Sequence, residues 1–91
     1  MRYFRTATFK RAYEKLDSSS RKRVDRALQQ LAVLYAQSEH PFGIGLKSLK
    51  PNIWEVRAGR GDRILFRWTG DTVEFLFVGS HDEIQRLLRA L

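Results

Sequence analysis

The chain has 91 residues, of which 43% are hydrophobic and 12% aromatic, and this predicts one folded domain over residues 1–91, near the lower size limit for a single core. The absence of cysteine excludes disulfides, thiolate metal sites and a cysteine nucleophile, and it fits the cytoplasm, where we expect the protein to act. No stretch resembles a secretory signal or a membrane span. The net charge of +7 favours a polyanionic partner, either nucleic acid or an acidic protein.

The first part of the chain predicts a short strand and a helical hairpin. "RYFRTA" alternates weakly, as a strand would, and "TATFKRAYEKLD" carries apolar residues at helical spacing. "DSSSRKRVDRALQQLAVLYAQSE" predicts a second, longer helix that Asp17 or a following serine caps. The apolar residues at helical spacing in the first helix are Phe9, Ala12, Tyr13 and Leu16. The buried stripe expected of the second helix is Val24, Leu28, Leu31, Ala32, Leu34 and Tyr35. The outer side of the second helix carries Arg21, Lys22, Arg23 and Arg26.

The second part predicts a meander and a last helix. "HPFGIG" interrupts the helical pattern, and segments with strand character follow in "GLKSL", "NIWEVRA", "RILFRW" and "TVEFLFVG". The connections "GRGD" and "TGD" are typical of tight antiparallel hairpins. "SHDEIQRLLRAL" predicts a helix that starts with a capping box of Ser80 and Glu83 and turns Ile84, Leu87, Leu88 and Leu91 inward. The order β-α-α-β-β-β-α predicts an α+β fold, in which an antiparallel meander sheet packs against a helical hairpin and a short C-terminal helix.

Alternation along the strands sorts their side chains into two faces. One face is expected to receive the helices and carries Trp54, Val56, Ala58, Ile64, Phe66, Trp68, Val73, Phe75 and Phe77. The other carries Glu55, Arg57, Arg63 and Arg67 among some aliphatic residues. Antiparallel pairing places Arg57 and Arg63 at the same end of the sheet and returns the last strand to that end. His81, just beyond the last strand, is therefore expected near both arginines.

A purely structural interpretation is open for each of these groups. Arg57 and Arg63 could be surface arginines, and Arg67 could be solvated or pair with Glu74. His81 could simply occupy a helix start, where Asp82 and Glu83 favour the helix dipole. We assign His40 to a loop, with no functional role. Two distant histidines and scattered carboxylates lack the spacing of metal ligands, so we expect neither a metal nor a cofactor.

The stretches "LKSLKPNIWEVRAGRGDRILFRW" and "VEFLFVGSHDEI" resemble the RelE/ParE superfamily of bacterial type II toxins. The resemblance covers essentially the whole chain in order and size. It is strongest in Trp54-Glu55-Val56-Arg57 together with Arg63-Ile64-Leu65-Phe66. It implies a RelE-like fold and a toxin that cleaves mRNA, often in the ribosomal decoding site, inhibits translation, and is held in check by an antitoxin.

The resemblance also implies roles for particular residues. Arg57 looks like a basic group of a RelE-type active site, and Arg63 looks like the arginine that faces the scissile phosphate. His81 stands where RelE-like members carry a basic catalytic residue, and the YafQ-like branch has a histidine in a similar corner. Two departures stand out. Glu55 replaces a lysine of RelE, and residues 84–86 hold no catalytic aromatic side chain, which implies a different or weaker way of stacking the base.

These residues together give a hypothesis for metal-independent RNA cleavage. Arg57 and Arg63 would stabilise the charged phosphorane, because a guanidinium matches two phosphate oxygens. His81 would act as general acid or base, with Glu55 as a possible complementary base. Salt-dependent contacts to the backbone of mRNA or ribosomal RNA are assigned to Lys47, Lys50, Arg60 and Arg67.

Two other functions are compatible with the same fold. A ParE-like toxin binds DNA gyrase without RNase chemistry, in which case the basic face would be an interaction surface. An inactive member would serve chiefly as an antitoxin-bound corepressor. An antitoxin partner is expected in each case. It would lay an acidic amphipathic segment over this surface, where Leu65 and Leu76 beside the arginines would suit it.

Overall fold

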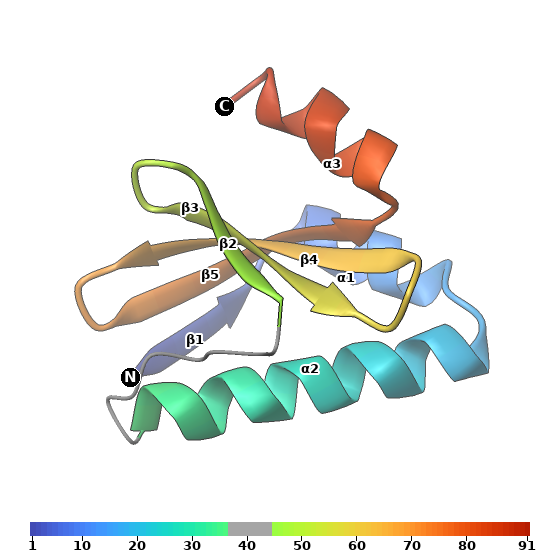
Figure 1. Cartoon of the computed structure of the whole chain (residues 1–91), viewed down its shortest axis with the longest axis horizontal. Coiled ribbons are helices and arrows are strands. Elements are labelled where there is room, and N and C mark those ends of the chain that lie inside the picture. The colour runs from blue at the N-terminus through green and yellow to red at the C-terminus, as the bar shows by residue number, and fades with distance from the viewer. Residues whose placement is uncertain (37–44) are drawn as a thin grey trace.

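The computed structural model describes residues 1–36 and 45–91, which form five strands and three helices (Figure 1). His40 lies outside the described residues, and so do the side chains of Leu34 and Tyr35. No described helix combines the length and apolar character needed to cross a membrane. The elements are β1 (Arg2–Arg5), α1 (Ala7–Glu14), α2 (Ser18–Ala36), β2 (Leu46–Lys50), β3 (Ile53–Ala58), β4 (Asp62–Thr69), β5 (Thr72–Gly79) and α3 (His81–Leu88).

The predicted α+β class is confirmed, with four strands in the meander because "GLKSL" also forms a strand, β2. All strands belong to one sheet in the order β1-β5-β4-β3-β2. The meander strands pair antiparallel, whereas β1 pairs parallel to β5. Thr6 ends β1: its hydroxyl donates to the Phe75 carbonyl at 2.9 Å and accepts the Phe9 N–H at 3.1 Å. This hydroxyl therefore ties the sheet to the start of α1.

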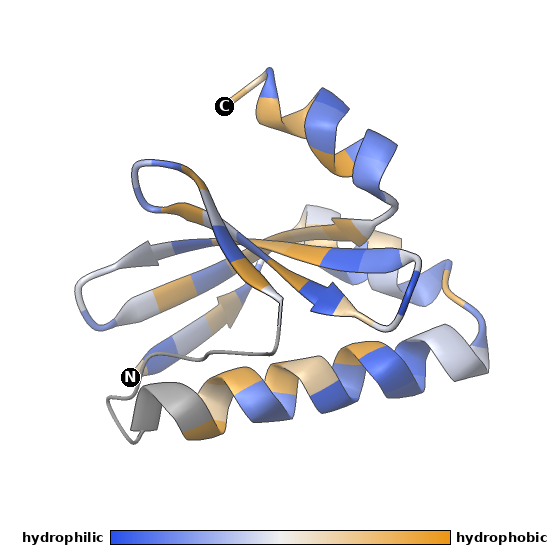
Figure 2. Ribbon diagram, in the orientation of Figure 1, coloured by the Kyte–Doolittle hydropathy of each residue, from blue (hydrophilic) through white to orange (hydrophobic). Residues whose placement is uncertain are grey.

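Helices α1 and α2 share one core with the sheet, and α2 runs below the sheet in Figure 1. Phe9, Val24 and Leu31 are fully buried there, and the apolar stripe of α2 faces the strands in Figure 2. Burial of this apolar surface is the main force that holds the two layers together. The strand residues in this core are Val56, Ala58, Ile64, Phe66, Val73, Phe75 and Val78.

Helix α3 packs on the opposite face, so the prediction that one face receives all the helices is wrong. Ile84 is fully buried against Ile53 and Leu65, with partly buried Leu49, Leu76, Phe77, Leu87 and Leu88 around them. The inward placement predicted for Ile84, Leu87 and Leu88 is confirmed. Leu91 is instead 46% exposed, because the helix ends at Leu88 and Leu91 lies beyond it.

A β-bulge in β5 overturns one predicted side-chain placement. Leu65 pairs with Phe77 but the next residue, Phe66, pairs with Phe75, so Leu76 is an extra residue in its strand. An extra residue shifts every later side chain to the other face. Phe77 therefore packs with α3 rather than beside Val73 and Phe75 as predicted, and Val78 joins the core under α1 and α2.

Candidate active site

The register of β3, β4 and β5 brings the predicted basic residues to one end of the sheet. Arg57 lies directly opposite Arg63, and Arg63 lies opposite Gly79 on its other side. His81 follows Gly79 by two residues and is the first residue of α3. The predicted pairing of the strand ends is thus confirmed, and Figure 1 shows the β3–β4 turn and the start of α3 at the same end of the sheet.

Arg63 is held by an ion pair with Glu55. Its Nη1 donates to Glu55 Oε1 at 2.8 Å, and the side chains are 25% and 3% exposed respectively. Glu55 projects from β3 on the α3 side of the sheet, where its strand partner Leu65 is fully buried. A carboxylate taken out of water in this way needs a cation, and Arg63 supplies it while keeping part of its guanidinium at the surface.

The Glu55 carboxylate is only half satisfied. Oε2 is buried and makes no hydrogen bond with any described residue. The Arg63 guanidinium thus engages one of the two carboxylate oxygens. The geometry suits a carboxylate that orients Arg63, and the burial separates it from a substrate at the surface.

His81 lies in a corner whose architecture does not use the imidazole. The predicted capping box is present: the Ser80 hydroxyl accepts the Glu83 N–H at 3.2 Å, and Glu83 Oε1 accepts the Ser80 N–H at 3.0 Å. His81 and Arg57 are both exposed. Neither makes a side-chain hydrogen bond or ion pair with the described residues. Both side chains are consequently available to a ligand at this end of the sheet.

The four predicted RNA-contacting residues fall into two groups. Arg60 is exposed in the turn after β3, and Lys47 is exposed on β2 directly opposite Glu55, so both adjoin the arginine pair. Lys50 and Arg67 flank the far end of β3, because both pair with Ile53. Lys50 Nζ donates to the Leu88 carbonyl of α3 at 3.0 Å. Arg67 contacts Glu74 at 3.6 Å, as the structural interpretation of this arginine expects.

Arg23 also lies near this end of the sheet, although the sequence predicted only that it lies on the outer side of the second helix. The Arg23 side chain lies against Gly59, the first residue after β3, close enough that a Cβ on Gly59 would stand 2.4 Å from Arg23 Cδ. Neither helical periodicity nor strand alternation carries a signal for this contact, because it joins α2 to a hairpin turn from the other half of the chain.

The apolar residues expected to meet an antitoxin are less accessible than predicted. Leu65 is fully buried and Leu76 is partly buried, and both belong to the cluster beneath α3. The prediction of Leu65 as a surface residue is wrong, because α3 covers the face on which it lies.

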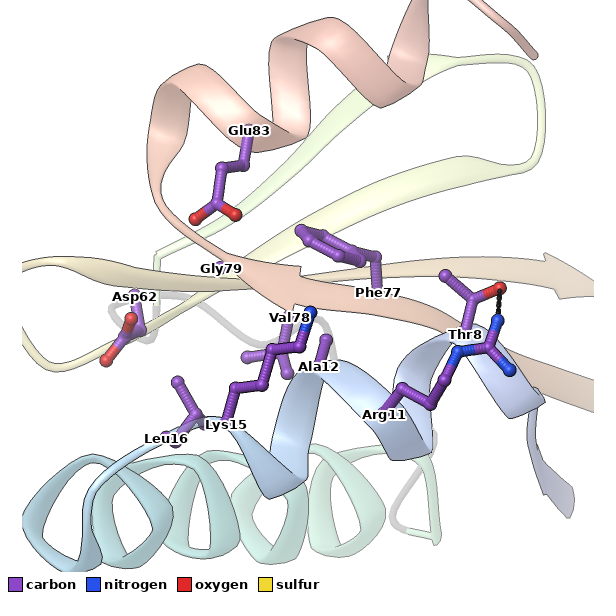
Figure 3. A pocket seen from close by; sticks show the side chains of 10 residues that line it. All are labelled: Thr8, Arg11, Ala12, Lys15, Leu16, Asp62, Phe77, Val78, Gly79 and Glu83. Atoms are coloured by element: carbon purple, nitrogen blue, oxygen red, sulfur yellow. Dashed lines mark hydrogen bonds between the residues drawn. The ribbon is translucent and has the colours of Figure 1, made fainter.

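A pocket of about 320 Å³ lies beside this end of the sheet, between α1, β5 and the start of α3 (Figure 3). Lys15 reaches from α1 toward β5, and the Glu83 carboxylate points toward the sheet from α3. Arg11 and Asp62 add one charge of each sign. Because the basic and acidic side chains balance, the charge of this pocket selects neither a phosphate nor a cation.

The part of the chain that the structure describes contains no cluster of three or more histidine or carboxylate side chains able to hold a metal ion. The arrangement at the sheet end therefore consists of two arginines, one of them backed by a buried carboxylate, and a histidine at a helix start. Such a set can bind a phosphate and exchange a proton beside it.

No protein-family model matches the chain, and no curated protein sequence matches it. Solved structures do. A copper-bound mutant toxin from Helicobacter pylori superposes with a TM-score of 0.69 at 15% identity, covering 92% of this chain and 98% of that one. A chain of the RelB–RelE antitoxin–toxin complex of Methanococcus jannaschii gives a TM-score of 0.69 at 20% identity, covering 92% of this chain and 96% of that one. YafQ of Escherichia coli gives 0.64 at 13% identity, covering 92% and 98%. The chain therefore has the fold of RelE-type and YafQ-type toxins, as its strand motifs predict.

Proposed function

We propose that this chain is the toxin of a type II toxin–antitoxin system and an endoribonuclease that cleaves mRNA, at the ribosome, to inhibit translation. The observation that carries the proposal is the strand register that gathers Arg57, Arg63 and the His81 corner at one end of the sheet. The likeness in fold to RelE and YafQ supports it.

The proposed reaction needs no metal. The ribose 2′-oxygen attacks the adjacent phosphorus while a base removes its proton, and the bond from phosphorus to the 5′-oxygen breaks as an acid protonates that oxygen. The products are a 2′,3′-cyclic phosphate and a 5′-hydroxyl. Arg57 and Arg63 stabilise the charge that builds on the phosphorane. His81 transfers one of the two protons, because histidine exchanges protons readily near neutral pH.

We assign Glu55 a role other than that of the complementary base, which the sequence had suggested for it. Its carboxylate is 3% exposed and already accepts from Arg63. A base must come within hydrogen-bond reach of the proton that it removes. We therefore assign Glu55 to holding the Arg63 guanidinium in position for the phosphate.

The RNA-binding residues extend the same surface. Arg60 and Lys47 adjoin the arginine pair and suit the phosphates next to the scissile one, whereas Lys50 and Arg67 suit more distant phosphates of mRNA or ribosomal RNA. Such contacts make binding strongly salt-dependent. A translating ribosome as the site of action agrees with the cytoplasmic location expected from the sequence.

An antitoxin is proposed as the protein partner. The similar toxin of Methanococcus jannaschii was solved in complex with RelB. On this chain, a net charge of +7 and the exposed Arg57 and Arg60 favour an acidic segment, which would cover the same sheet end and block access of RNA.

The rival function is ParE-like binding of DNA gyrase without chemistry. The Arg63–Glu55 ion pair favours this rival, because it gives Arg63 a structural role that requires no RNA ligand. The two functions predict different cellular effects. Cleavage gives rapid translation arrest and cut mRNA, whereas gyrase binding gives a DNA-damage response and filamentous cells.

The decisive experiment replaces His81 with alanine. His81→Ala is expected to lower the rate of RNA cleavage about 10²–10⁴-fold, the range for loss of an acid–base group. The fold and antitoxin binding are expected to persist, because His81 is exposed and the capping box does not involve its side chain. Arg89→Ala, which removes an exposed cation beyond the other end of α3, is the matched control and is expected to cleave like the parent.

Two further readouts sharpen this test. The cleaved ends should carry a 2′,3′-cyclic phosphate and a 5′-hydroxyl, the products of attack by the ribose 2′-oxygen. Unchanged toxicity of the His81→Ala chain in cells would refute the assignment of His81. DNA damage without mRNA cuts on expression of the parent chain would refute the nuclease.

A further inference from the structure

The positive charge of this protein is concentrated away from the candidate active face. Residues 1–36 contain nine of the seventeen arginines and lysines but only three of the ten acids. Within α2, the cations Arg21, Lys22, Arg23 and Arg26 are all exposed. This helix lies on the opposite side of the sheet from α3 (Figure 1).

Arg23 differs from its neighbours in being held in place. Its Nη2 donates to the hydroxyl of Ser20, a mostly buried residue, at 3.0 Å. Its Cδ and Nε cross over Gly59, where a Cβ would stand 2.4 and 2.7 Å from them. Gly59 also has a positive φ of +74°, so the turn accepts a glycine far more readily than any other residue. Because Gly59 has no side chain, Arg23 occupies the space beside the turn.

The turn that Arg23 reaches belongs to the candidate active site. Gly59 follows Arg57 by two residues, which limits the separation of their Cα atoms to about 7 Å. Arg60 is the next residue and is exposed. Figure 1 shows this turn above the N-terminal half of α2, at the sheet end where α3 begins. Arginines from both sides of the sheet therefore meet around one hairpin.

We propose that Arg23 binds a backbone phosphate of single-stranded RNA beside the scissile one, so that the strand runs from Arg57 and Arg63 over the β3–β4 turn toward α2. This inference rests on the proposed nuclease function and defines the path of its substrate. One Nη of Arg23 is engaged by Ser20, and the remaining N–H groups of the guanidinium fork serve a phosphate. Because the side chain is already positioned, little rotamer entropy is lost on binding.

The test measures binding separately from cleavage. A single-stranded RNA with 2′-O-methyl groups cannot be cleaved by 2′-oxygen attack, and its affinity for the parent chain and variants is measured by fluorescence anisotropy over a salt series. Arg23→Ala is expected to weaken binding about tenfold, as for the loss of a charge-assisted hydrogen bond. The slope of log affinity against log salt should fall by about 0.7, as for one single-strand phosphate contact.

Lys22→Ala is the matched control, since it removes the same charge from the adjacent exposed position of α2. It is expected to change affinity less than about twofold and to leave the salt slope unaltered. Ser20→Ala keeps the charge of Arg23 but removes its hydrogen bond, so an intermediate loss is expected. Circular dichroism checks that each variant is folded.

The outcomes separate this inference from the proposed function. Equal losses for Arg23→Ala and Lys22→Ala would overturn the role of Arg23, even if the unmodified RNA is cleaved. A loss specific to Arg23 without cleavage of mRNA on translating ribosomes would refute the nuclease and retain the RNA contact. If the parent chain binds polyglutamate of equal charge as tightly as RNA, and Arg23→Ala weakens both alike, the surface serves an acidic protein and the RNA path is overturned.

Discussion

Arg63 and Glu55 form an ion pair across β3 and β4 that is buried on the carboxylate side and partly open on the arginine side, with Nη1 and Oε1 2.8 Å apart. The two residues therefore contribute unequally to the free energy of unfolding. Removing Arg63 leaves a carboxylate that is 3% exposed without a cation, whereas removing Glu55 leaves an arginine that reaches water.

Arg63→Leu is accordingly expected to destabilise the fold by about 3 kcal/mol or more, as for breaking a buried pair, and Glu55→Leu by clearly less. The double variant should recover most of the loss, because the uncompensated carboxylate is gone. Denaturant unfolding of all four proteins gives the coupling energy. Equal losses for both single variants, with simple additivity in the double variant, would show that the pair carries no such asymmetry.

The catalytic role of Glu55 can be separated from its structural one through Glu55→Gln. Glutamine still accepts a hydrogen bond from Arg63 but lacks the charge that orients it, so cleavage should fall about tenfold, the loss expected for one charge-assisted contact. If Glu55 positions Arg63, the pH dependence of kcat/KM keeps the shape that it has in the parent, because Glu55 exchanges no proton.

A Glu55 that acts as the base predicts a different profile. The acidic limb of the pH profile would then disappear in Glu55→Gln, and the rate would fall by about 10²–10⁴-fold. Lys47→Gln, which alters the exposed residue opposite Glu55, controls for the local change in charge. It should keep the pH profile of the parent in either case.

The sequence was sufficient for the elements and for the gathering of Arg57, Arg63 and His81, because both follow from short hairpins and antiparallel pairing. It could not place Phe77, since the run Phe75-Leu76-Phe77-Val78 is apolar at every position and alternation cannot reveal a bulge within it. The side of the sheet that α3 covers was equally hidden. The side of the sheet on which α3 packs depends on the bulge and on tertiary packing. This packing in turn determines that Leu65 and Glu55 are buried.

The start of α2 should make stability depend on pH through Asp17. Its carboxylate accepts the Ser20 N–H at 2.7 Å. This hydrogen bond, with a further contribution from the Ser20 hydroxyl, lowers the pKa of Asp17 below its ordinary value. A group whose pKa is lower in the folded state stabilises the fold above its unfolded pKa of about 3.9, and that contribution disappears as the pH falls through the folded value.

Asp17→Asn keeps a capping oxygen but cannot ionise, so it isolates this effect. The melting temperature of the parent should exceed that of Asp17→Asn near neutral pH, and the difference should shrink as the pH is lowered below about 3.9. Asp71→Asn, at an exposed turn aspartate for which Thr72 donates a weak hydrogen bond at 3.2 Å, is the control and should show little change with pH. Equal melting temperatures at all pH values would mean that the capping oxygen, and not the charge, matters.

Ile84 should hold α3, and with it His81, against the sheet. It is fully buried among Ile53 and Leu65, and α3 meets β4 and β5 through this cluster. Ile84→Ala is expected to cost about 2–5 kcal/mol and Ile84→Val about 0.5–1.5 kcal/mol, the usual range for deleting buried methyl groups. Leu91→Ala, at a residue that is 46% exposed, should stay within about 0.5 kcal/mol of the parent.

Helix α3 packs on the sheet through a small cluster of its own. The loss of stability in Ile84→Ala should therefore appear first as local opening of α3 away from the sheet. Amide hydrogen exchange should quicken in residues 84–88 more than in β4, and RNA cleavage should fall although His81 itself is retained. If exchange rises uniformly over the whole chain, α3 unfolds only together with the sheet. Ile84 would then contribute to global stability without a separate hold on the position of His81.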